Sequence, residues 1–339
     1  MKQLYSMIGL LLVGTAFGQQ VSFETLLEDK ISIRAIELWE GKVWYAGSQS
    51  KFGYVEINNP ENQKQVFLDD ENKEYRTIAM YPKQVFTTVN IGSPAQFMGV
   101  SYELKPSKLD AYDQTEAFFD SYKVSAEHIS SIAISDPLED GTPLFRITSK
   151  KLNDRSNANL PTYIKGEAHF AASNTNIALK DDLVWIASGG MQSRIFKFNW
   201  ATPYQWEVYE TPFDKGNETT GIYSIDFYNT EIGIAVGGDY KKQSNNINNI
   251  ATTNDGGKTW QTQASGKNAG YMTCVKYRPN SNGKDILAVG DQHISLSRDY
   301  GKTWKKLADQ KNLYTLDRVD EENVVLAGKD RILKMKINF

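Results

Sequence analysis

Short apolar runs separated by turn-forming residues recur along the whole chain. The runs are rich in β-branched and aromatic residues, and the segments between them are rich in Gly, Asn, Asp and Pro. No stretch carries an apolar stripe with the 3.6-residue period of an amphipathic helix. The pattern therefore predicts many short strands joined by turns, with little helix.

One nine-residue segment occurs twice and marks a larger repeat. Residues 252–260 (TTNDGGKTW) align with residues 296–304 (LSRDYGKTW), 44 positions further along. Each copy follows an alternating apolar run that ends in Val-Gly, and weaker versions of this run recur elsewhere. The seven runs are residues 43–47, 84–89, 132–136, 184–190, 234–237, 286–290 and 324–328.

Seven units of this size predict a ring of sheets. About 320 residues divided over seven units gives roughly 46 residues each, which is usual for a blade of four strands. We therefore expect an all-β, seven-bladed β-propeller with four-stranded antiparallel blades. The last unit ends at Phe339 after its third strand, whereas an extra strand at residues 21–27 precedes the first run. This N-terminal strand is expected to close the last blade, which removes two free sheet edges.

The N-terminus predicts export. Lys2 precedes the apolar run at residues 7–13, and small residues follow up to Gly18. This is the pattern of a secretory signal peptide, here residues 1–18, and the run is shorter than the roughly 20 residues that cross a bilayer. No cysteine follows the expected cleavage site to carry a lipid. We expect residues 19–339 to form one β-propeller domain, a monomer without a membrane span in the periplasm or outside the cell.

Composition and charge exclude several functions. A formal net charge of −3 with 23% charged residues gives no strongly basic surface, so we expect no nucleic-acid partner. The single cysteine, Cys274, lies in an apolar run and is expected to be a buried thiol. The histidines His128, His169 and His293 lie far apart in the sequence and predict no metal site.

The repeated nine-residue segment resembles the Asp-box, also called the bacterial neuraminidase repeat. In such a turn the Asp accepts hydrogen bonds from backbone N–H groups, the second Gly position allows a positive φ, and the Trp packs against the sheet. We expect both copies to join the two outer strands of a blade and to stabilise the fold rather than to contact a ligand. The residues concerned are Asp255, Gly257, Trp260, Asp299, Gly301 and Trp304.

Five further segments resemble a bacterial family of secreted propellers related to photosystem II assembly or stability factors. They are residues 75–79, 135–141, 166–177, 219–225 and 233–240. The resemblance implies a binding or assembly module that acts outside the cytoplasm. Many members of that family carry the label "oxidoreductase". This sequence does not support the label, because it has no glycine-rich dinucleotide loop, Cys-x-x-Cys pair or haem-attachment motif, so we expect no cofactor.

A ligand site is expected at one mouth of the ring. In a propeller, the innermost strand of each blade begins on the face to which the loop between its second and third strands returns, so both line one funnel. Arginines there can bind an anionic group with two parallel hydrogen bonds, although polar groups in such channels often only satisfy backbone groups and water. The expected ligand-binding residues are Arg34, Arg76, Asp136, Glu167, His169, Arg194, Asp239 and Tyr240.

Two functions fit this funnel. The first is a binding or assembly module that recognises a protein segment or a polar or anionic small ligand. The alternative is a carbohydrate-active hydrolase, a sialidase-like glycosidase, with paired funnel carboxylates such as Glu167 and Asp136 or Asp239. Residues 145–148 (FRIT) come nearest to the sialidase Phe-Arg-Ile-Pro signature, but they lack its proline and lie in mid-chain. The sequence assigns no catalytic residue.

Overall fold

The strands were located in a computed structural model that describes residues 21–82, 85–112, 116–125, 127–148 and 160–339. The expected signal peptide, residues 1–18, lies outside the described residues. The described part of the chain forms 27 strands. It contains no helix that is both long and apolar enough to cross a bilayer.

The strands are mostly short, as expected from the apolar runs. In chain order they are β1 (Val21–Trp39), β2 (Lys42–Gly47), β3 (Lys51–Glu56), β4 (Gln63–Phe67), β5 (Ala79–Tyr81), β6 (Val85–Val89), β7 (Ala95–Ser101), β8 (Pro106–Tyr112), β9 (Phe119–Ser125), β10 (Ser130–Ser135), β11 (Leu144–Thr148), β12 (Glu167–Ala168), β13 (Ile177–Lys180), β14 (Leu183–Ala187), β15 (Gly189–Gly190), β16 (Arg194–Asn199), β17 (Thr202–Glu210), β18 (Thr220–Phe227), β19 (Gly233–Asp239), β20 (Ile250–Thr253), β21 (Gln261–Thr262), β22 (Cys274–Tyr277), β23 (Ile286–Gly290), β24 (His293–Ser297), β25 (Lys305–Ala308), β26 (Leu313–Arg318) and β27 (Asn323–Ile337).

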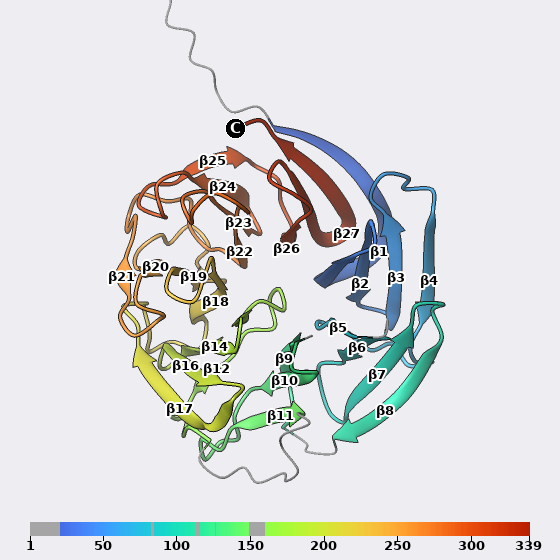
Figure 1. The fold of residues 1–339 in the computed structure, drawn as a ribbon, viewed down its shortest axis with the longest axis horizontal. Coiled ribbons are helices and arrows are strands. Elements are labelled where there is room, and N and C mark those ends of the chain that lie inside the picture. Colours follow the sequence, from blue (N-terminus) through green and yellow to red (C-terminus); the bar gives the residue numbers. More distant parts are fainter. Residues whose placement is uncertain (1–20, 83–84, 113–115, 126, 149–159) are drawn as a thin grey trace, which may run out of the picture.

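The described strands form six antiparallel sheets that stand in a ring around a central axis (Figure 1). The prediction of an all-β propeller is confirmed, but the prediction of seven four-stranded blades is wrong, because the six sheets have three to six strands each. In spatial order the sheets are β26-β27-β1-β2-β3-β4, β5-β6-β7-β8, β11-β10-β9, β13-β14-β16-β17, β12-β15-β18-β19-β20-β21 and β22-β23-β24-β25.

The number of sheets is smaller than the number of repeats because β1 is shared. Its 19 residues pair with β27 from Val21 to Ser32 and then, in the same strand, with β2 from Ile33 to Trp39. The segments expected to form the first and the last blade are therefore one six-stranded sheet. Figure 1 shows the start of β1 beside the end of β27, so hydrogen bonds between the two ends of the described chain close the ring.

The hydrophobic core lies between neighbouring sheets. The described residues of each apolar run lie largely in a strand that has a hydrogen-bonded neighbouring strand on both sides. Such central strands are buried on both faces of the sheet. Trp44 on β2 and Phe86 on β6, for example, are both fully buried and stack across two sheets with ring centroids 4.2 Å apart. Burying side chains of this size stabilises the fold by about 2 to 3 kcal/mol each. The prediction for Cys274 is also confirmed, since it is a free, buried thiol.

One loop crosses the inside of the ring. It consists of residues 169–176, between β12 and β13, and we call it the crossing loop (Figure 1). Every residue from 171 to 176 is buried. Asn174 donates a hydrogen bond to the Ile78 carbonyl and accepts one from the Tyr122 N–H, both at 2.8 Å. Thr175 donates to the Ser224 hydroxyl at 2.7 Å, so the loop is bound to segments from several sheets.

Candidate functional site

Two arginines hold the crossing loop from two different sheets. Arg34, on β1, donates from Nη1 to the Ala172 carbonyl at 3.2 Å. Arg76, shortly before β5, donates from Nη1 to the Ala171 carbonyl at 3.4 Å. Because they bind adjacent residues of one loop, the two guanidinium groups lie together on one face of the ring. We call this face, with Arg34 and Arg76 at its centre, the crossing-loop face.

The surroundings of Arg34 are aromatic and partly buried. Its guanidinium lies over the ring of Tyr314, 4.0 Å from the centroid. Burial and the positive charge of Arg76 lower the pKa of Arg34, while the nearby Asp291 carboxylate acts in the opposite direction. Arginine stays protonated in proteins, so two cations remain close together here. Such a pair favours a carboxylate or another anion beside it.

Asp136 and His169 are also brought together at the crossing loop, but their contacts are internal. The His169 backbone N–H donates to Oδ1 of Asp136 at 2.7 Å. On the His169 ring, Nδ1 lies 2.8 Å from the Ala187 carbonyl, so it donates there, and Nε2 accepts from the Tyr163 hydroxyl at 2.8 Å. Burial lowers the pKa of His169 to about 4. The imidazole is therefore neutral near pH 7 and positions the start of the crossing loop.

A second buried carboxyl group lies beside Asp136 and was not expected from the sequence. Asp120, on β9, is fully buried. Burial and then the charge of Asp136 raise the pKa of Asp120 well above its usual value, whereas Arg76 acts in the opposite direction. Burial also raises the pKa of Asp136 to about 7. This pair of carboxyl groups therefore holds a proton at neutral pH, which reduces the desolvation cost of burying both.

Glu167 and Arg194 bind each other instead of presenting free charges. Arg194 Nη2 and Nε donate to the two carboxylate oxygens of Glu167 at 2.5 and 3.0 Å. The Ser188 hydroxyl donates to the same carboxylate at 2.5 Å, and the Glu167 side chain is fully buried. This bidentate pair orients the segment before the crossing loop. Its carboxylate oxygens are already engaged by protein donors.

Asp239 and Tyr240 lie at the edge of the same face. The carboxylate of Asp239 is buried and accepts hydrogen bonds from the Thr219 hydroxyl at 2.7 Å and from the Lys241 N–H at 2.9 Å. Tyr240 is 45% exposed. Burial raises the pKa of Tyr271, and Asp291, Arg34, Tyr240 and Asp239 all influence it electrostatically. Three of the predicted residues, Arg34, Asp239 and Tyr240, therefore lie near Tyr271 on the same face.

The eight expected residues thus gather around the crossing loop, but they differ in what they can offer a ligand. Glu167, Arg194, His169 and Asp239 are engaged in internal hydrogen bonds. Arg34 and Arg76 each donate one guanidinium hydrogen bond to the loop, and Arg76 also donates from Nε to the Glu74 carboxylate at 2.8 Å; both keep further N–H groups. A role for any of them in ligand binding remains a prediction.

A group of charges that the sequence did not lead us to expect lies deeper in the channel. A cavity of about 190 Å³ is lined by Ser173 of the crossing loop and by four charged side chains from inner strands. These are Glu37, Lys123, Lys276 and Asp317. Burial raises the pKa of Glu37 to about 7, and burial together with Lys276 lowers the pKa of Lys123. In the sequence only Lys276 is a single charge inside an otherwise uncharged strand, whereas Glu37, Lys123 and Asp317 share their strands with other charged residues, so no simple pattern marks the group.

The two segments that resemble the Asp-box form turns with matching hydrogen bonds. Asp255 Oδ1 accepts from the Thr259 N–H at 3.0 Å, and Asp299 Oδ1 accepts from the Thr303 N–H at 2.8 Å. Gly257 and Gly301 have φ of 87° and 84°, and each accepts a hydrogen bond from the indole N–H of the following Trp, Trp260 or Trp304. The turns connect β20 to β21 and β24 to β25.

The fold and this face define the class of protein as a β-propeller with a loop crossing its channel. No protein-family model matches the chain, and no curated protein matches it. Solved structures do match the fold. A streptogramin B lyase structure aligns with a TM-score of 0.67 at 14% identity, covering 94% of this chain and 98% of the other.

Two further solved structures are similar in the same way. A catalytically inactive variant of virginiamycin B lyase from Staphylococcus aureus with Quinupristin aligns with a TM-score of 0.64 at 9% identity, covering 94% of this chain and 99% of the other. YCF48 bound to D1 peptide aligns with a TM-score of 0.62 at 12% identity, covering 94% and 97%. At these identities the similarity shows a shared fold alone.

Proposed function

We propose that this protein is an exported binding module that recognises a protein segment at the crossing-loop face. In this proposal, the guanidinium groups of Arg34 and Arg76 receive an acidic side chain or a free carboxyl terminus of that segment. The single observation that carries the proposal is the fixed pairing of these two arginines on the loop. A ligand would meet two preoriented cations and would not have to order them first.

The chemistry of the neighbouring groups supports a peptide-like ligand. Tyr314 lies under Arg34, and the exposed Tyr240 stands at the edge of the face. Aromatic and arginine side chains are the residue types that contribute most to protein-binding surfaces. The structure of YCF48 bound to D1 peptide adds that a protein with this fold binds a peptide.

Peptide selection tests the proposal. A displayed library of random 12-residue peptides, each with a free carboxyl terminus, would be selected on the purified protein, and enriched peptides remade with free and amidated termini. We expect acidic or carboxyl-terminal groups to be required. We also expect Arg34→Ala combined with Arg76→Ala to weaken binding at least about tenfold, because charge-assisted hydrogen bonds contribute about 1.5 to 3 kcal/mol each.

A matched control separates this site from general charge effects. Arg298→Ala removes one positive charge from an exposed position on an Asp-box turn, and it should leave peptide affinity unchanged. Circular dichroism must show that the double variant is folded. Equal affinity of the double variant and the wild type for the selected peptides would reject the proposed site.

Export is part of the proposal, supported by the signal-peptide pattern of residues 1–18. Cell fractionation would compare the full chain with a chain that lacks these residues. We expect only the full chain to leave the cytoplasm and to lose about 18 residues, which mass spectrometry would detect as a new N-terminus at Gln19. Retention of both chains in the cytoplasm would contradict this part.

The hydrolase alternative has one supporting observation. The Asp120 and Asp136 pair has raised pKa values, as catalytic carboxyl groups often do. Asp120, however, is fully buried, and the carboxylates of Glu167 and Asp239 are held by protein donors. Turnover of aryl glycosides that is lost in Asp136→Asn, while the melting temperature stays unchanged, would favour the hydrolase over the binding module.

A further inference from the structure

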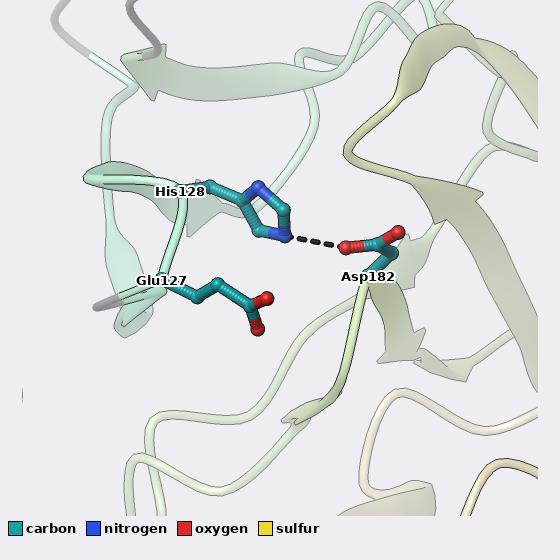
Figure 2. A group of neighbouring side chains, drawn as sticks. All are labelled: Glu127, His128 and Asp182. Atoms are coloured by element: carbon teal, nitrogen blue, oxygen red, sulfur yellow. Dashed lines mark ion pairs between the residues drawn. The ribbon is translucent and has the colours of Figure 1, made fainter.

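Two turns from neighbouring sheets bring three possible metal ligands together. Glu127 and His128 lie in the turn between β9 and β10, and Asp182 lies in the turn between β13 and β14. One ligand atom from each residue falls within 4.8 Å of the other two. Figure 2 shows the His128 ring and the Asp182 carboxylate facing each other, with the Glu127 carboxylate on the same side.

The distances suit a first-row divalent cation after small side-chain movements. His128 Nε2 lies 2.6 Å from Asp182 Oδ1. Around a tetrahedral ion with ligands at about 2.0 to 2.2 Å, two ligand atoms stand about 3.4 Å apart. The distance between His128 Nε2 and Asp182 Oδ1 must therefore increase by about 1 Å, and the longest of the three distances between ligand atoms must decrease by about 1 Å or slightly more. The Glu127 and Asp182 side chains are exposed, so rotation about their side-chain bonds can supply this movement.

The donor set also selects the kind of metal. One imidazole nitrogen with two carboxylates is typical of Zn²⁺ and its first-row neighbours, whereas Ca²⁺ and Mg²⁺ prefer oxygen ligands only. Partial exposure leaves room for water to complete the coordination, as in zinc sites with three protein ligands. Two negative carboxylates beside a neutral imidazole would neutralise the charge of the ion.

We propose that Glu127, His128 and Asp182 form a Zn²⁺-type site that links the β9–β10 turn to the β13–β14 turn. The ion would bind two adjacent sheets together at a place where the described contact between the turns is a single ion pair, from His128 to Asp182. This site lies apart from Arg34 and Arg76, so it is independent of the peptide-binding proposal.

Calorimetry on the purified full chain, free of any histidine tag, tests this site with ZnCl₂ as the probe. We expect one saturable Zn²⁺ per chain at pH 7.5 and a higher melting temperature when it is bound. Loss of one of three ligands should weaken binding at least about tenfold, so His128→Ala and Asp182→Ala should each show this effect. CaCl₂ should bind much more weakly than ZnCl₂.

Asp181→Asn provides the matched control. Asp181 precedes Asp182 in the same turn, and asparagine tolerates its positive φ of 51°, so this variant changes the local charge and keeps the turn. It should bind Zn²⁺ as the wild type does. The proposal is overturned if the wild type shows no saturable Zn²⁺ binding, or if His128→Ala and Asp181→Asn bind it equally. In either case the cluster would be an ion pair only.

Discussion

Replacing Asn174 by alanine tests whether the crossing loop is a fixed part of the fold. Asn174 is 1% exposed, has a φ of 59°, and bonds both the Ile78 carbonyl and the Tyr122 N–H at 2.8 Å. Alanine would leave both backbone groups buried without this partner. Alanine would also have to adopt the left-handed backbone conformation of this position, which asparagine tolerates better.

The expected cost follows from these contacts. Each buried backbone group that loses its partner costs about 1 to 3 kcal/mol, and the left-handed conformation adds about 1 kcal/mol. We therefore expect Asn174→Ala to lower the free energy of unfolding by about 4 kcal/mol, a large part of the roughly 5 to 15 kcal/mol of a typical protein. Asn174→Asp keeps the acceptor for the Tyr122 N–H, but it buries a carboxyl group and turns one of its oxygens toward the Ile78 carbonyl, so it should cost at least as much as alanine.

Urea denaturation followed by tryptophan fluorescence would measure these differences. The control is Asn282→Ala, because Asn282 has a similar φ of 54° but an exposed side chain. It should cost only the conformational part, about 1 kcal/mol. If Asn174→Ala destabilises the protein no more than Asn282→Ala does, the hydrogen bonds of the crossing loop do not hold the sheets together as described.

Three further predictions concern charge and ring closure. Burial raises the pKa of Glu37 to about 7 in the folded protein, above its value in the unfolded chain. The folded state is therefore favoured while this carboxyl group is protonated, and the free energy of unfolding decreases as the pH rises from about 4 through 7. Glu37→Gln should equal the wild type in stability at pH 4 and exceed it by up to about 3 kcal/mol at pH 8, and a pH-independent difference in urea melts would contradict this. Although burial acts to raise it, hydrogen bonds from Thr259 and Thr253 hold the pKa of Asp255 at about 2. Its carboxylate thus stabilises the fold above about pH 4 and loses this effect as the pH falls toward 2, so Asp255→Ala should cost about 1 kcal/mol at pH 7, after allowance for its exposure, and less at pH 2. Deleting residues 21–28 removes the partner of β27 and should lower the urea midpoint more than any single substitution above, and an unchanged midpoint would show that ring closure contributes no stability.

The sequence predicted the strands well because their signal is local. The apolar runs, such as residues 43–47 and 286–290, form central strands that are buried on both faces. The turns at residues 252–260 and 296–304 were also recognisable, since the hydrogen bonds that the side chains of Asp255 and Asp299 accept come from residues within four positions. The number of sheets could not be predicted, because it depends on whether β1 breaks between its pairing with β27 and its pairing with β2, and the apolar pattern is the same in both cases.

The sequence indicated several residues that lie on the crossing-loop face, but not the contacts that they make, and their role as a site stays a prediction. Repeat register placed Arg34 and Arg76 on one face, yet nothing in the sequence indicated that residues 169–176 cross the channel and accept their hydrogen bonds. That loop depends on contacts between residues about 100 positions apart. The Glu167 and Arg194 pair illustrates the same limit, because register placed both residues on the face but could not show that they bind each other.

Hydrogen–deuterium exchange in the presence of the best selected peptide tests the central claim most directly. If Arg34 and Arg76 receive the peptide, added protection from exchange should fall on segments around residues 34, 76, 240 and 314, and it should disappear in the double arginine variant. Protection confined to the turns at residues 252–260 and 296–304, or to the strand segments around Glu37 and Lys276, would place the binding surface elsewhere and contradict the account.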